Sequence, residues 1–381
     1  MFKLSHVSAG FIAVLVGYTS SAAIVFQAAY AAGATPAELT SWMCALGVGM
    51  AATCIGLSLY FRTPILTAWS TPGAALLITG LAGLPMSQAI GVFLFSSLLI
   101  AIIGFSGWFD RVMKYVPRTL AAAMLAGVLL RFGMDVFVVL PSQGLLVGLM
   151  LGCYLVGRRF LPIYSVPITF FVGVIVAGSQ GLLNFSSIQL SIAQPKWMMP
   201  SFEFSSLLGV GLPLFIVTMA SQNVPGLAVL RANGYNTPAS PLIGWTGLTG
   251  LLLAPFGGFS FNLAAITAAL CMSKDADPDP KRRYMAAVWA GMFYLVTGVL
   301  GATVVGLFAA FPRALIVTIA GLALLGTIGN GLVSALSDEK EREAALVTFL
   351  ATASGMTIFG VGSAFWGLLL GMATAWVNHR R

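Results

Sequence analysis

Two apolar segments of this 381-residue chain contain polar residues, glycine and proline where a continuous helix is expected. In the first, Ser70 and Thr71 precede Pro72 and Gly73. Thr71 is a good N-cap and proline suits the first helical position, so the pattern predicts a half-helix that begins in mid-membrane. Such a helix start presents free N–H groups and the positive end of the helix dipole, both of which attract anions.

The second segment runs from Gly257 to Asn262, where Ser260 is the candidate cap and Phe261 stands before the asparagine. Unwound backbone at membrane depth is tolerated only where protein buries it or where it lines a cavity. Two half-helices that start near the midplane would aim their N-termini at one point, which predicts an anion site made without charged side chains. The alternative is that proline and glycine only kink two packed helices.

Two more polar clusters interrupt apolar runs. Tyr18 opens a Tyr-Thr-Ser-Ser cluster in the first run, and Ser221, Gln222 and Asn223 stand just before Pro225. Serine and threonine often bond only to their own helix, whereas side-chain amides are costlier to bury in a membrane without a partner. We therefore expect Gln222 and Asn223, together with Tyr18, to complete the pocket.

The chain lacks the residues expected of an intramembrane enzyme. Its two histidines, His6 and His379, fall outside the predicted spans, and neither an HExxH nor a GxSxG motif occurs. All eleven acidic residues fall in loops or at the ends of spans. We therefore expect no catalytic residues, no metal site and no cofactor.

The composition indicates a membrane protein. Hydrophobic residues make up 59% of the chain and charged residues only 8%, against roughly 25% charged residues in soluble domains. A spanning helix needs about 20 apolar residues. Cutting the charge-free runs at glycine, proline and polar turns gives about fourteen segments, so the predicted fold class is an all-α membrane protein.

The basic residues that give the net charge of +8 are distributed as expected for a protein inserted in a membrane. With fourteen spans and the N-terminus in the cytoplasm, sixteen basic residues fall inside and only Arg131, Lys196 and Arg313 fall outside. The basic excess therefore needs no nucleic acid to explain it. An i,i+4 ion pair with Asp135 is expected to satisfy Arg131. The runs 274–283 and 338–343 are expected to be solvated cytoplasmic loops.

The chain also repeats itself weakly. Residues 115–131 lie over 310–326 without a gap, and the Gly-to-Pro stretch 33–36 is echoed at 234–238. Seven spans in each repeat is an odd number, so the second repeat must be inverted, and such repeats place the substrate site at their interface. The predicted organisation is a first repeat over 1–180, an external linker over 181–204 and a second repeat over 205–381.

Five stretches carry a resemblance to a known family: GYTSSAAIVFQAA (17–29), AWSTPGAALLITG (68–80), LAAAMLAGVLLRFG (120–133), LPLFIVTMASQNVPG (212–226) and SAFWGLL (363–369). Nearly end to end, the chain resembles the benzoate:proton symporter (BenE) family, which is similar in fold to uracil and nucleobase permeases and to sulfate-type anion transporters. The resemblance implies a 7+7 inverted repeat with half-helices at spans 3 and 10. Spans 1–4 and 8–11 would form a core, spans 5–7 and 12–14 a gate, and two copies a homodimer.

The chain departs from the nucleobase permeases at two acidic positions. Those permeases carry one carboxylate in span 8, where this chain has Gln222, and another beside the span 10 asparagine, where Phe261 precedes Asn262. A carboxylate substrate would be repelled by such acids, so their replacement favours an organic anion. The aromatic side chains that are candidates to sandwich a ring are Phe26, Trp69, Phe259 and Phe261.

The sequence thus predicts a multi-pass transporter of the bacterial cytoplasmic membrane, with both termini inside, that takes up benzoate or a similar aromatic carboxylate with protons by alternating access. The predicted substrate-binding residues are Tyr18, Ser70, Thr71, Pro72, Gly73, Gln222, Asn223, Ser260, Phe261 and Asn262. A nucleobase or other anion carrier of the same fold, and an anion channel, remain open alternatives. We expect the proton to travel on or beside the substrate carboxylate, the alternative being Asp135 or Glu38.

Overall fold

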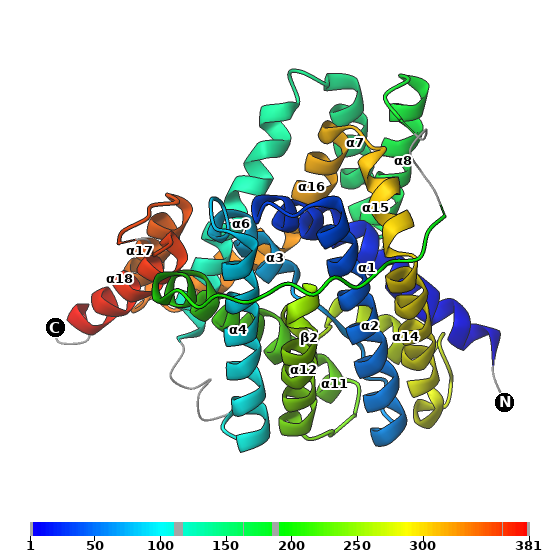
Figure 1. Cartoon of the computed structure of the whole chain (residues 1–381), viewed down its shortest axis with the longest axis horizontal. Coiled ribbons are helices and arrows are strands. Elements are labelled where there is room, and N and C mark those ends of the chain that lie inside the picture. The colour runs from blue at the N-terminus through cyan, green and yellow to red at the C-terminus, as the bar shows by residue number, and fades with distance from the viewer. Residues whose placement is uncertain (1–2, 110–116, 163, 185–189, 360, 379–381) are drawn as a thin grey trace.

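The computed structural model describes residues 3–109, 117–162, 164–184, 190–359 and 361–378 of the chain. It is a mostly helical molecule with one small sheet (Figure 1). His379 and residues 185–189 of the predicted linker lie outside the described residues. The predominance of helices, several of them long and apolar enough to cross a membrane, confirms the predicted helical membrane protein.

Seven helices in the described part are long and apolar enough to cross a membrane. They are α1 (Leu4–Ala31), α2 (Pro36–Phe61), α4 (Met86–Ser106), α6 (Arg118–Val139), the run Phe204–Ala232, α12 with its 3-10 extension (Ala239–Phe256) and α16 (Arg313–Ala335). An eighth arises if Pro280–Val299 and Gly301–Ala309, bent by 70°, count as one span. The number of fourteen spans stays a prediction, because the other helices are shorter.

The shorter helices are α3 (Thr71–Gly80), α7 (Gly144–Phe160), α8 (Ser165–Ser179), α13 (Ile266–Met272), α14 (Tyr284–Val299), α15 (Gly301–Ala309), α17 (Arg342–Ala353) and α18 (Ser363–Asn378). Two of them, α3 and α13, each follow a three-residue strand, β1 (Thr67–Trp69) and β2 (Phe261–Leu263) respectively. These are the two interrupted segments that the sequence singled out, and both contain a half-helix.

The two strands pair with each other in antiparallel register, with Ala68 opposite Asn262. Ser70 N–H donates to the Ser260 carbonyl and Ala264 N–H to the Leu66 carbonyl, which extends the pairing at both ends. Unwound backbone in an apolar environment must find hydrogen-bond partners within the protein. The sheet supplies them, because each broken segment satisfies the other.

The predicted caps of both half-helices need correction. The N-cap of α3 is Ser70, one residue before the predicted Thr71, and its side chain accepts from Gly73 N–H. Helix α13 begins only at Ile266 after Ala265, because the chain first forms β2, so Ser260 caps nothing. Ser260 instead has a positive φ of 45°, at the bend that leads into the strand.

The run Phe204–Ala232 contains two π-helical turns, η2 (Leu207–Gly211) and η3 (Met219–Asn223). They alternate with α9 (Phe204–Ser206), α10 (Leu212–Thr218) and α11 (Val224–Ala232). Pro213 and Pro225 follow the two π turns. A proline cannot donate to the carbonyl four residues before it and its ring crowds that carbonyl, so the backbone widens into a π turn.

The helices pack in two groups. In the first, α2 packs on α14, α4 on α12, and α1 on α3, α13 and α14. Glycine permits the α2–α14 approach, since a Cβ on Gly47 would lie 2.4 Å from the Cα of Gly298. In the second group, α6 packs on α16 and α17, α7 on α8, and α17 on α18. The groups meet where α1, α3 and η3 contact α8, α6 and α16 (Figure 1).

The described part of the predicted linker, residues 190–203, crosses the first group in an extended conformation (Figure 1, green). Ala193 N–H donates to the Val299 carbonyl and Lys196 N–H to Ser41 Oγ. The Lys196 ammonium also pairs with Glu38 at 3.0 Å. The linker is therefore tied to the helices that it crosses.

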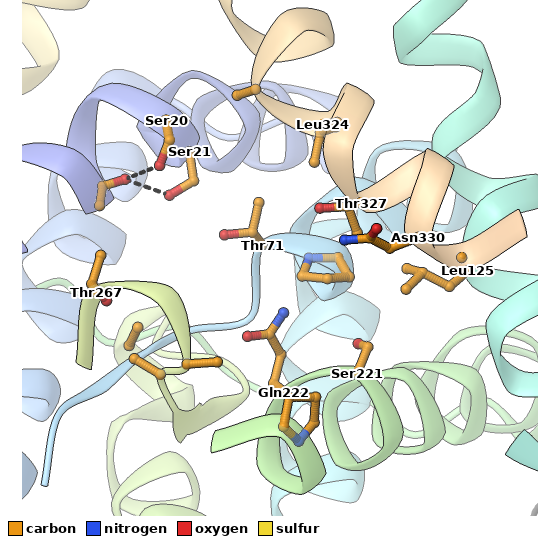
Figure 2. Close-up of a pocket in the computed structure, with 18 of the residues that line it drawn as sticks. Ser20, Ser21, Thr71, Leu125, Ser221, Gln222, Thr267, Leu324, Thr327 and Asn330 are labelled. Carbon is orange, nitrogen blue, oxygen red and sulfur yellow. Dashed lines mark hydrogen bonds between the residues drawn. The ribbon is translucent and has the colours of Figure 1, made fainter. Parts of the chain in front are cut away.

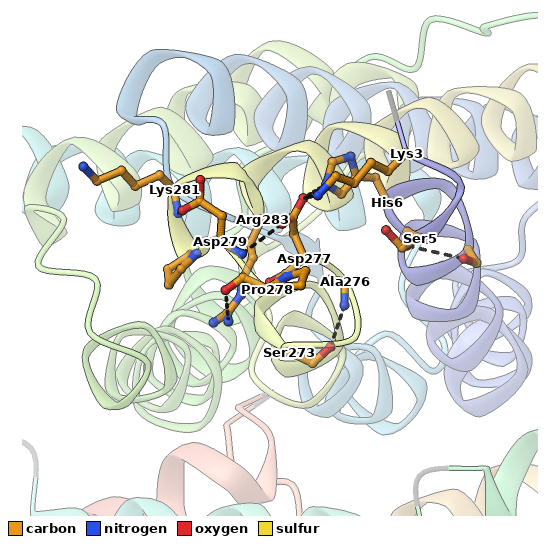
Figure 3. Close-up of polar contacts among 12 residues, drawn as sticks. Lys3, Ser5, His6, Ser273, Ala276, Asp277, Pro278, Asp279, Lys281 and Arg283 are labelled. Carbon is orange, nitrogen blue, oxygen red and sulfur yellow. Dashed lines mark hydrogen bonds and ion pairs between the residues drawn. The ribbon is translucent and has the colours of Figure 1, made fainter. Parts of the chain in front are cut away.

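Two expectations about charged groups are wrong. Among the described residues Arg131 makes no ion pair with Asp135, although the two lie one turn apart on α6. The run 274–283 is only partly solvated, because Asp277 is fully buried and Arg283 is 7% exposed. Asp277 Oδ2 contacts His6 Nε2 at 2.8 Å and Lys3 Nζ at 2.9 Å, which joins the start of α1 to the loop after α13 (Figure 3).

Candidate functional site

A cavity of about 590 Å³ lies where the two helix groups meet. Its wall combines α1, α3, η3, the start of α13 and α14 from the first group with α6, α7, α8 and α16 from the second. Small-molecule sites in proteins have volumes of roughly 300–1,000 Å³. The cavity is therefore large enough for a small organic ligand, and it touches both predicted half-helices.

The start of α3 reaches the cavity through Thr71 and Pro72. The Thr71 hydroxyl points into it and makes no hydrogen bond within the described part of the chain (Figure 2). Ser70 and Gly73 lie behind this wall, where Ser70 Oγ accepts from Gly73 N–H at 3.0 Å. Ser70 and Gly73 thus hold the helix start, while Thr71 is the polar group that it presents.

Gln222 lies on the π turn η3 and lines the cavity. Its side-chain amide points toward the same space as Thr71 (Figure 2), and no described residue hydrogen-bonds to it. The adjacent Asn223 is fully buried, and its Oδ1 accepts from Leu263 N–H at 3.0 Å. Asn223 therefore fastens β2 to η3, and Gln222 is the amide that stays available to a ligand.

The α1 side of the cavity carries Ser20, Ser21 and Trp69. Ser21 Oγ accepts from Trp69 Nε1 at 2.8 Å and donates to the Gly17 carbonyl at 2.7 Å, so both side chains are fixed. Tyr18 is not on the wall, and its ring packs edge-on against Trp69 with the centroids 4.9 Å apart. Tyr18 supports the wall from behind.

The predicted residues of the second broken segment also lie behind the wall. Asn262 Nδ2 donates to the Ser260 carbonyl at 2.9 Å, and Phe261 is buried against Gly49. The cavity touches the segment only at Ala264, Ala265 and Thr267. Residues 260–262 therefore shape the sheet, and the start of α13 contributes the Thr267 side chain.

Only one of the four aromatic candidates lines the cavity. Trp69 does so, whereas Phe26 packs on Phe308 and Phe259 lies between Trp42 and Phe93. Two tyrosines that the sequence did not single out, Tyr154 on α7 and Tyr294 on α14, are on the wall instead.

Sequence reasoning also missed the polar groups of the second helix group. Thr327 and Asn330 on α16 point into the cavity from the side opposite Gln222 (Figure 2). Asn330 interrupts an apolar run just as Gln222 does, so the same reasoning from amide burial would have found it. Arg118 and Arg158 also line the cavity, although their positions had suggested only a topological role.

The wall residues that the structure describes carry cationic and neutral polar groups and no carboxylate. Among the described residues no group of three or more histidine, cysteine, aspartate or glutamate side chains is placed to hold a metal ion. Arg118 and Arg158 supply positive charge, and the α3 dipole adds a partial one. The arrangement suits a small anion.

Comparisons with known proteins agree with this geometry. The family model described as "Benzoate membrane transport protein" (BenE) matches residues 1–377. The chain is 51% identical to the "Inner membrane protein YdcO" of Escherichia coli over 95% of its length and 93% of that protein. It is 40% identical to a "Benzoate membrane transport protein" of Acinetobacter baylyi, over 97% of its length and 94% of that protein.

Solved structures share the fold at low sequence identity. The transmembrane domain of the cyanobacterial bicarbonate transporter BicA matches with a TM-score of 0.61 and 14% identity, over 99% of this chain and 97% of that domain. The structure of SLC26A9 matches with a TM-score of 0.58 and 14% identity, over 97% of this chain and 65% of that one.

Proposed function

Because the chain belongs to the benzoate membrane transport protein (BenE) family, we propose that it takes up benzoate or a similar aromatic carboxylate together with protons. It is a multi-pass bacterial inner-membrane protein and a membrane transporter rather than an enzyme. The identity of the substrate and the coupling to protons are the parts that we propose.

One observation carries the proposal: the described wall of the cavity has positive charge, free polar side chains and aromatic rings, but no carboxylate. The substrate carboxylate lies between Thr71 and Gln222 at the start of α3, where the helix dipole favours negative charge. Trp69 flanks the ring on the α1 side. A nucleobase offers several N–H donors and would gain more from acidic acceptors, which this wall lacks.

We further propose that the two helix groups are the two domains of an alternating-access carrier. The first group is the core domain with the half-helices α3 and α13, and the second is the gate domain. Antiparallel pairing of β1 with β2, and the start of both α6 and α16 at an arginine after a proline, support a 7+7 inverted repeat. Ser70, Gly73, Asn223, Ser260, Phe261 and Asn262 then act by positioning the groups that touch substrate.

The orientation proposed for the protein places both termini in the cytoplasm. Arg118 and Arg158, at the start of α6 and the end of α7, are then on the cytoplasmic side, as the positive-inside rule favours. Both are exposed while lining the cavity, so the cavity opens toward that side. In this orientation the cavity opens toward the cytoplasm, so the structure is an inward-facing state.

A ligand panel on purified protein tests the substrate. Benzoate should raise the melting temperature, because a ligand at 100 times its Kd stabilises the folded state by about 2.7 kcal/mol. Uracil and sulfate, measured at the same concentrations, should shift it much less. A uracil response equal to that of benzoate would point instead to a nucleobase carrier, and uptake that does not saturate in proteoliposomes would point to a channel.

A further inference from the structure

Two arginines on the cavity wall have no acidic partner. Arg118 is the first residue of α6 and Arg158 lies in the last turn of α7, and both line the cavity. Neither forms an ion pair or a hydrogen bond within the described residues. Because both are exposed, the two guanidinium groups stand at the open end of the cavity rather than in its interior.

The Arg158 side chain is held in place by helix packing. A Cβ built on Gly326 of α16 would lie 3.2 and 3.3 Å from its two terminal nitrogens, so the guanidinium rests on the bare backbone of that glycine. Thr327 follows directly on α16 and Asn330 lies one turn further, both on the cavity wall. Arg158 therefore bridges α7 and α16 beside the polar groups of the gate domain.

One acid near Arg118, Glu341, is hydrogen-bonded to the residue that follows this arginine. Glu341 accepts a hydrogen bond from the Thr119 hydroxyl, next to Arg118, yet it forms no ion pair with Arg118. Within the described ranges, therefore, no acid pairs with the positive charge at the open end. A guanidinium is weakly hydrated and matches a carboxylate with two parallel N–H donors, so it suits brief capture of an organic anion.

We propose that Arg118 and Arg158 form a second anion-binding subsite at the open end of the cavity. During uptake it receives the substrate carboxylate as this leaves Thr71 and Gln222 for the cytoplasm, and a carboxylate that enters the purified protein through the open end meets it first. This inference rests on the proposed function. Since both arginines belong to the gate domain and the deeper site belongs to the core domain, the carboxylate passes from one domain to the other. The capture is electrostatic in water, so salt screens it.

The test is the rate at which benzoate binds to the purified full-length protein, followed by the fluorescence of its tryptophans, including Trp69 on the cavity wall. Arg118→Gln and Arg158→Gln should each slow association, and the double variant by about tenfold at low salt, because rim charges act mainly on the association rate. The double variant should also lose most of the salt dependence. Binding of benzamide, the neutral analogue, should not change.

Arg159→Gln is the matched control. Arg159 is the exposed neighbour of Arg158, lies over the Phe160 ring at 6.0 Å, and is not on the cavity wall. It should bind benzoate as the wild type does. Lysine variants at 118 and 158 should keep the salt dependence of benzoate association. If they lost as much of the association rate and salt dependence as the glutamine variants, the arginines would only support the fold.

The outcomes separate the two proposals. If the wild type binds no aromatic carboxylate, the proposed function fails, and the subsite fails with it. If the wild type binds benzoate, and the double glutamine variant binds it at the same rate with the same salt dependence, the subsite alone is wrong.

Discussion

At the scale of single residues, two adjacent amides have different tasks. Asn223 is fully buried and satisfies the backbone of β2, while Gln222 is half-buried and free on the cavity wall. Consecutive residues of a helical turn point in different directions, about 100° apart in an α-helix, so these two neighbours face different surroundings. The amide without a protein partner is the one that can discriminate between ligands.

Gln222→Glu should abolish benzoate transport near neutral pH. It would place a negative charge beside the bound carboxylate in a partly dehydrated site, where like charges repel strongly. Repulsion raises the pKa of the new glutamate, so transport should partly recover as the pH falls and the group is protonated. Uptake of labelled benzoate by proteoliposomes from about pH 5 to about pH 8, which spans that titration, measures this.

Gln143→Glu provides the control for that substitution, since Gln143 precedes α7 and is not on the cavity wall. It introduces the same charge elsewhere and should leave uptake unchanged. Normal uptake by Gln222→Glu at the alkaline end of the range would place residue 222 away from the bound anion.

Sequence reasoning found segments that form part of the cavity wall, but it did not predict which of their residues face the cavity and which lie behind the wall. Thr71, Pro72 and Gln222 line the cavity, whereas Ser70, Gly73 and Asn262 hydrogen-bond within the broken segments. The reason is that unwound backbone needs hydrogen-bond partners and takes them from nearby polar side chains. Which side chains it takes depends on the three-dimensional fold. The cavity residues of the second helix group were missed because helix contacts between distant segments bring them to the cavity.

At the scale of elements, the half-helices depend on contacts that hold them in place. Proline and serine in the first broken segment predicted a helix start to within one residue, because capping is local chemistry. The β1–β2 pairing could not be predicted in this way, since it joins residues that are far apart in the sequence, such as Ala68 and Asn262, which are 194 positions apart. That pairing also delays α13 to Ile266, which is why the predicted Ser260 cap is wrong.

The loop after α13 is fixed by Asp277 (Figure 3). Lys3 Nζ and Asp279 N–H, and then His6, hold the pKa of the Asp277 carboxylate well below its usual range. Arg283, itself buried, donates to the Asp277 carbonyl at 2.7 Å and to the Met272 carbonyl at 2.9 Å. The loop between α13 and α14 is thereby anchored to the start of α1.

Asp277→Asn should lower the melting temperature of the purified protein at neutral pH, because Lys3 and His6 lose their carboxylate. A depressed pKa means that the ionised carboxylate stabilises the fold above the ordinary aspartate pKa of about 3.9, and that this stabilisation is lost as the pH falls further. The gap between wild type and variant should therefore be constant above about pH 5 and narrow below about pH 4.

Asp275→Asn is the control for the loop, since Asp275 is exposed and has no ion pair among the described residues. It should melt like the wild type over the whole pH range. Equal melting of Asp277→Asn and the wild type at neutral pH would mean that the contacts of Asp277 do not hold the loop.

At the scale of the whole molecule, the cavity lies between two helix groups, and none of its described wall residues is acidic. An anion that moves inward works against the membrane potential by about 2.3 kcal/mol per 100 mV. A proton that moves with it cancels this charge. Carriers usually pass such protons along aspartate, glutamate or histidine side chains inside the membrane, and the part of this cavity wall that the structure describes has none.

The two acids that could serve instead lie away from the cavity. Glu38 caps α2 through Thr35 and pairs with Lys196, and Asp135 is half-buried on α6 without reaching the wall. Protonation of the substrate carboxylate, held by Thr71 and Gln222, therefore remains the simplest route. It requires no titratable side chain in the transport path.

We therefore expect Asp135→Asn and Glu38→Gln to keep the wild-type ratio of protons to benzoate, glutamine being able to replace glutamate in the helix cap. The measurement is simultaneous proton flux and labelled benzoate uptake in proteoliposomes, with an ionophore clamping the membrane potential. Lower total uptake at an unchanged ratio of protons to benzoate would reflect the stability or expression of the variant and would agree with a proton carried by the substrate. A variant that still moves benzoate but no longer moves protons with it would assign the proton to that side chain, and the substrate-borne route would be wrong.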